Sequence, residues 1–93
     1  MNRRERWQKV LDAEMKRWSE KSYEELRTVL SESLVYEVEF DSQQHQVEID
    51  VLEATPVYLH VSISVDDGTL PASIRPTTGT FIRRKSGAYT LDH

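Results

Sequence analysis

A ten-residue alternation of apolar and polar side chains, from Val57 to Asp66, constrains the fold more than any other feature. Its odd-numbered residues are all aliphatic, and its even-numbered residues all carry a polar group. Successive side chains of an extended chain point to opposite faces, so this pattern predicts a half-buried β-strand. We expect it to be the central strand of a sheet with one apolar and one polar face.

Two helices are predicted before the strands. Apolar residues recur every three or four positions between Arg4 and Trp18, which is typical of an amphipathic helix whose stripe faces a core rather than a partner. Ser22 and Glu25 have the spacing of a capping box, so a second, shorter helix should begin at Ser22. The expected core residues of the two helices are Trp7, Val10, Leu11, Met15, Trp18, Leu26, Val29 and Leu30.

The remaining segments predict an antiparallel meander. Residues 34–40 and 47–52 alternate like the central strand, and the short polar stretch 41–45 between them favours a hairpin. Asp67-Gly68 predicts a turn, and residues 76–79 a second one. The segment 69–75 fits an irregular edge strand or a loop, 80–84 a last strand, and 88–93 a frayed tail.

These elements predict a single α+β domain over residues 1–93. One or two helices within 1–31 should pack on one face of a four- to five-stranded antiparallel meander sheet spanning 34–84. The element order resembles cystatin-like folds, in which a helix lies across a curved antiparallel sheet. Fold alone carries no function.

A candidate binding surface follows from the expected strand register. Setting Phe40 beside Val47, and Val51 beside Leu59, brings apolar residues together on one face. The opposite face then gathers acids from the first two strands and a histidine from the third, with like charges across the first pair. These five candidate residues are Glu37, Glu39, Glu48, Asp50 and His60.

The charge distribution favours a basic protein partner or a second copy of the chain. The net charge is −4, and residues 32–53 contain seven acidic residues and no lysine or arginine. This acidic balance argues against nucleic acid, whose binding needs a concentrated positive field. A homodimer is the commonest assembly for a small open sheet. The alternative is that these acidic residues are simply exposed to solvent and bind no ligand.

The sequence gives little support for an enzymatic function. The chain has no cysteine, no phosphate-binding glycine loop and no paired-histidine metal motif. His60, Ser62 and Asp66 project from one face of one strand, whereas a hydrolase triad converges on a point. We therefore predict no catalytic residue, metal or cofactor. The open alternative is a small-molecule pocket or enzyme site between helix and sheet, with inward-facing Tyr36 as its polar group.

The cellular setting is predicted from what the sequence contains. No apolar run is long enough to span a bilayer, and no hydrophobic signal segment follows the charged residues at the start of the chain. The absence of cysteine suits a reducing compartment. We expect a soluble cytoplasmic protein that does not bind membranes.

Overall fold

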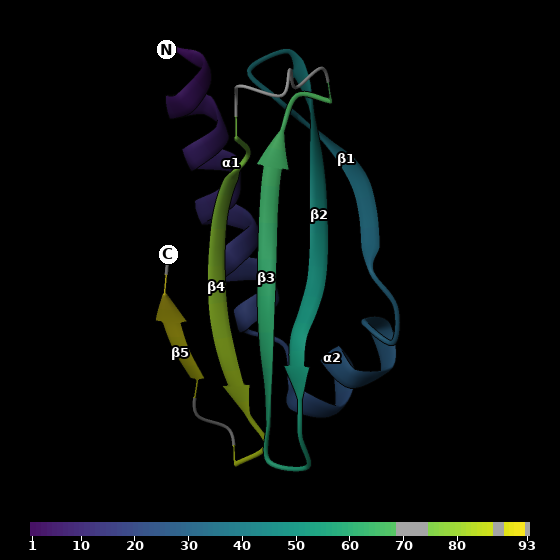
Figure 1. Ribbon diagram of the computed structural model, residues 1–93. Helices are drawn as coiled ribbons and strands as arrows, with labels where there is room; N and C mark the ends of the chain where they lie inside the picture. The colour runs from purple at the N-terminus through teal and green to yellow at the C-terminus, as the bar shows by residue number, and fades with distance from the viewer. Residues whose placement is uncertain (69–74, 87–88, 93) are drawn as a thin grey trace.

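In the residues that the structure describes, two helices pack on one face of a five-stranded antiparallel sheet whose strand order is β1-β2-β3-β4-β5. A computed structural model describes residues 1–68, 75–86 and 89–92. The elements are α1 (Arg3–Ser19), α2 (Tyr23–Val29), β1 (Leu34–Phe40), β2 (Gln43–Ala54), β3 (Tyr58–Asp66), β4 (Thr77–Arg84) and β5 (Tyr89–Asp92). Figure 1 shows α1 crossing behind β3 and β4, with α2 near the end of the sheet where β1 begins. The predicted α+β class is confirmed.

Both helices begin at capped N-termini. The Asn2 side chain accepts a hydrogen bond from the backbone N–H of Glu5 over 2.8 Å, and Ser22 Oγ accepts one from the N–H of Glu25 over 3.1 Å. The Glu25 carboxylate accepts from Lys21 Nζ rather than completing the predicted capping box. The predicted start of the second helix is thus confirmed.

The core lies between α1 and the inner face of the sheet, the face that packs on the helices. Trp7 and Trp18 are 1% and 3% exposed, so the predicted packing of the helix stripe is confirmed. Leu59, Val61, Ile63 and Val65 of β3 are also buried. Two residues that the sequence predicts on the buried side, Val29 and Val57, are exposed instead. Val29 is the last residue of α2, and Val57 lies just before β3.

The hairpin between β1 and β2 is tighter than predicted. Asp41 and Ser42 form a two-residue turn with φ of 55° and 60°, and β2 begins at Gln43. Two left-handed residues in succession are the signature of a type I′ turn, whose twist matches that of paired strands. The predicted loop 41–45 is therefore too long, and its last three residues belong to β2.

Replacing Ser42 with glycine should stabilise the protein. Ser42 adopts a left-handed backbone conformation that costs a non-glycine residue about 1–2 kcal/mol, and the entropy that glycine loses on folding offsets part of the gain. We expect the free energy of unfolding to rise by about 0.5–1 kcal/mol, measured by urea denaturation. Ser31→Gly, at an exposed position that lacks a positive φ, should bring no such gain.

The C-terminal half differs from the prediction at two places. Residues 77–79 belong to β4 rather than to a turn, and Tyr89–Asp92 form β5, paired with β4, rather than a frayed tail. The predicted turn at Asp67-Gly68 is present: Gly68 has a φ of 78°, and its N–H donates to Asp66 Oδ1. The possible edge strand at 69–75 lies, except for Arg75, outside the described residues.

Candidate binding surfaces

The five candidate residues all lie on the outer face of the sheet, which turns away from the helices. Glu37 and Glu39 alternate with inward residues of β1, and Glu48 and Asp50 do so in β2. His60 is on β3 between buried Leu59 and Val61. The three glutamates are exposed, whereas Asp50 and His60 are half-buried. We call Glu37, Glu39, Glu48 and Asp50 the acidic outer face.

The register that the sequence predicted for the first hairpin is wrong. Val47 lies opposite Tyr36, not Phe40, because the two-residue turn sets the pairing. Glu37 therefore faces Gln46 and Glu39 faces Gln44. The predicted carboxylate pairs across this ladder do not form, so the acids coexist on one face without being directly opposed.

The predicted register of the second hairpin is also wrong. Asp50 lies opposite Ser62, and His60 lies opposite Glu53 beyond an irregularity between Val51 and Glu53. The predicted registers would align Glu37, Asp50 and His60 in a row across three strands, and the observed pairing does not assemble this row. A β-bulge inserts an extra residue and changes the pairing beyond it.

The acidic outer face is only partly satisfied by neighbouring side chains. The Ser33 hydroxyl donates to Asp50, and on the same face Tyr58 donates to Glu53, which raises the pKa of the Tyr58 hydroxyl. Within residues 1–68 and 75–86, no side chain forms an ion pair or hydrogen bond with Glu37, Glu39 or Glu48. Three carboxylates thus remain available to a cation in solution or on a partner.

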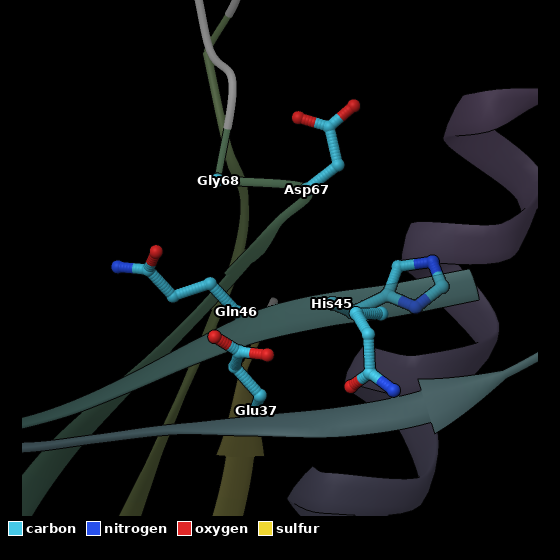
Figure 2. A pocket seen from close by; sticks show the side chains of 6 residues that line it. Glu37, His45, Gln46, Asp67 and Gly68 are labelled. Atoms are coloured by element: carbon cyan, nitrogen blue, oxygen red, sulfur yellow. The ribbon is translucent and has the colours of Figure 1, made fainter.

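A polar hollow of about 340 Å³, which Glu37 lines but Glu39 and Glu48 do not, lies near the β1–β2 turn and Asp67-Gly68. Figure 2 shows Glu37 and Gln46 together on one side, with Asp67 and Gly68 above them. The His45 ring points away from Glu37, as expected for a residue of the inner face. Asp67 is already paired with Arg3 Nε at 3.5 Å. In the described part of the chain, no three acidic, histidine or cysteine side chains converge as metal ligands would.

A second, more apolar depression lies between α1 and β1 on the inner side. This groove has a volume of about 240 Å³. Its walls are Lys9, Val10, Ala13 and Glu14 from α1 and Val38, Glu39 and Phe40 from β1. Val38 and Phe40 stay half-buried because α1 lies against β3 and β4 rather than over the sheet margin. The groove therefore exposes apolar surface beside an edge strand.

A buried hydrogen-bond network borders this groove. The Tyr36 hydroxyl donates to Glu14 Oε1 over 2.6 Å and accepts from Trp18 Nε1 over 2.8 Å. Arg17 Nη1 is 3.6 Å from Glu14 Oε2, and its guanidinium lies over the rings of Trp18 and Tyr36. Burial, and then the hydrogen bond to Glu14, raise the pKa of Tyr36 well above its ordinary value near 10. The network satisfies Glu14, which is 5% exposed.

Glu14 and His45 are among the buried polar residues that sequence reasoning missed. Glu14 lies three positions after Leu11 and four before Trp18, so helical periodicity alone places it on the buried stripe. His45, which is 1% exposed, was assigned to a loop. Its Nδ1 lies 3.1 Å from the carbonyl of Gln43, and its ring meets Phe40 edge-on at 6.3 Å between centroids. Both are structural groups with partners inside the fold.

Comparison of the chain with protein-family models, with curated proteins and with solved structures gives no match. The likeness in element order to cystatin-like folds therefore stays a prediction. Neither helix in the described residues has the length and apolar character needed to cross a membrane. The chain offers a ligand two surfaces: the acidic outer face, and the apolar groove beside β1.

Proposed function

We propose that this protein is a small, non-catalytic interaction module that binds a basic partner through its acidic outer face. The observation that carries the proposal is the set of three exposed carboxylates on β1 and β2, Glu37, Glu39 and Glu48, for which the described residues supply no cationic partner. Exposed charges at a binding surface contribute more to the specificity and the rate of association than to affinity.

The alternative of a small-molecule site between helix and sheet has a counterpart in the groove between α1 and β1. Its volume of about 240 Å³ is below the range of roughly 300–1,000 Å³ that is usual for ligand pockets. Two glutamates lie in its wall: buried Glu14 is already engaged by Tyr36 and Arg17, and Glu39 is exposed. The groove thus offers a ligand apolar contact without a free buried polar group, which favours the interaction module.

The proposal predicts charge-dependent binding of a flexible cationic peptide. The probe is a blocked peptide of lysine and serine, and binding is measured by isothermal titration calorimetry at 20 mM and 150 mM salt. An exposed ion pair contributes about 0.2–1 kcal/mol, so Glu39→Gln should weaken binding by a factor of about 1.4 to 5. Raising the salt concentration should also weaken it, because the contacts are exposed and screened.

A matched control separates this surface from net charge. Glu20→Gln removes the same charge from an exposed residue at the C-cap of α1, away from the outer face. Binding to this variant should remain close to that of the wild-type protein. Equal loss of affinity in Glu39→Gln and Glu20→Gln would contradict the proposed surface, and so would absence of peptide binding at low salt.

A further inference from the structure

The margin of the sheet at β1 presents backbone groups that no strand of the described residues covers. Among those residues β1 pairs only with β2, and it lies at the margin of the sheet (Figure 1). In a hairpin with a two-residue turn, the residues flanking the turn form a hydrogen-bonded pair, and such pairs alternate along the ladder. Phe40 and Gln43 flank this turn, so β1 bonds to β2 through its even-numbered residues. The backbone N–H and C=O groups of Val35, Glu37 and Glu39 therefore point outward from the sheet.

The side chains along this margin divide by face. The outer face presents Glu37 and Glu39, both exposed and unpaired within the described residues. The inner face presents half-buried Val38 and Phe40, which line the groove facing Val10. An extended segment added beside β1 would thus meet carboxylates on one side and apolar surface on the other.

We propose that β1 is a docking edge for an extended segment of a partner protein whose residues alternate between basic and apolar. Resting on the proposed function, this inference adds the binding mode: the segment adds antiparallel to β1 as a sixth strand. Its residues opposite Glu37 and Glu39 are lysine or arginine, and its intervening residues place apolar side chains against Val38 in the groove. Strand addition derives affinity from main-chain bonds and specificity from alternate side chains.

Charge disfavours a second copy of this chain as the occupant. Two β1 strands that pair about a two-fold axis at Glu37 place that glutamate opposite its own copy. Pairing about Val38 places Glu37 opposite the Glu39 of the other copy. Like charges directly across a ladder are destabilising, and edge charges of this kind guard natural sheets against self-pairing. The same carboxylates attract a basic segment.

The test uses a nine-residue blocked peptide of alternating lysine and valine. In the proposed register the lysine N–H groups point toward β1 and the valine N–H groups point away. Backbone N-methylation of two central lysines should therefore weaken binding at least ten-fold, whereas N-methylation of two central valines should leave it within about two-fold. The modified peptides share composition and charge. In the wild-type complex, amide hydrogen exchange at Val35, Glu37 and Glu39 should slow at least ten-fold.

A variant of the protein provides a second, independent test of strand addition. Proline is tolerated on an edge strand where its missing N–H would face solvent, so Val35→Pro should fold while blocking the added strand. Its affinity for the alternating peptide should fall about ten-fold relative to Val35→Ala, with both folds checked by circular dichroism. Equal binding of the two N-methylated peptides, without slowed exchange at β1, would overturn strand addition. Binding of the lysine–serine peptide to the acidic outer face would then still stand; loss of that binding as well would overturn both proposals.

Discussion

Replacing Trp18 with alanine is expected to lower the free energy of unfolding by about 3–5 kcal/mol, the usual cost of removing a large aromatic side chain from a core. Trp18 is 3% exposed, and its Nε1 donates to the Tyr36 hydroxyl. Its ring is also covered by Arg17 and Lys21, whose charged groups lie 5.5 and 5.3 Å from its centroid. The substitution removes packing and a hydrogen-bond donor together. The total stability of a domain is about 5–15 kcal/mol, so the loss is a large share of it.

Urea denaturation followed by circular dichroism measures this effect, because the signal does not depend on the tryptophan itself. Val57→Ala is the control: Val57 is 62% exposed, and its truncation should change the free energy of unfolding by no more than about 0.5 kcal/mol. An unfolding midpoint in Trp18→Ala equal to that of the wild type would contradict the docking of α1 on the sheet.

Sequence periodicity was sufficient to predict the core because odd- and even-numbered residues of a strand point to opposite faces, and only one face is buried. Tyr36 and Val38 alternate with Glu37 and Glu39 whatever their partners on β2. The predicted register placed Val47 beside Phe40, whereas the structure places it beside Tyr36, a shift of an even number of residues. An even shift keeps every side chain on its own face. Face assignments thus survive a register error, but pairings across strands do not.

The register could not be predicted because the turn lacks its usual sequence. Type I′ turns favour glycine or asparagine, and here Asp41 and Ser42 take the two left-handed positions. The polar stretch around His45 predicts a loop, yet His45 lies in β2, because the backbone hydrogen bonds between strands do not depend on side-chain polarity. The composition of the acidic outer face was therefore predictable, whereas its arrangement was not. The groove beside β1 depends on where α1 lies over the sheet, which periodicity does not specify.

Replacing Tyr36 with phenylalanine should lower the free energy of unfolding at pH 7 by about 1.5–3 kcal/mol, the range for a hydrogen bond to a charged group. The buried carboxylate of Glu14 loses the hydroxyl that donates to it over 2.6 Å, and Trp18 Nε1 loses its acceptor. Tyr58→Phe is the matched control. Tyr58 donates to Glu53 on the outer face, where Glu53 is exposed and water can replace the lost donor, so its loss should cost less.

The effect of Tyr36→Phe should depend on pH in the alkaline range. Burial and the bond to Glu14 raise the pKa of Tyr36 in the folded protein, while the unfolded chain keeps a value near 10. A raised folded pKa gives stability that is complete below the unfolded value and is lost as pH rises through the folded value. The difference in unfolding free energy between wild type and Tyr36→Phe should therefore be constant up to about pH 9 and narrow between about pH 10 and pH 12. A difference that stays constant up to pH 12 would show that Tyr36 ionises as readily in the folded protein as in the unfolded chain, and the network joining α1 to β1 would then not hold its proton.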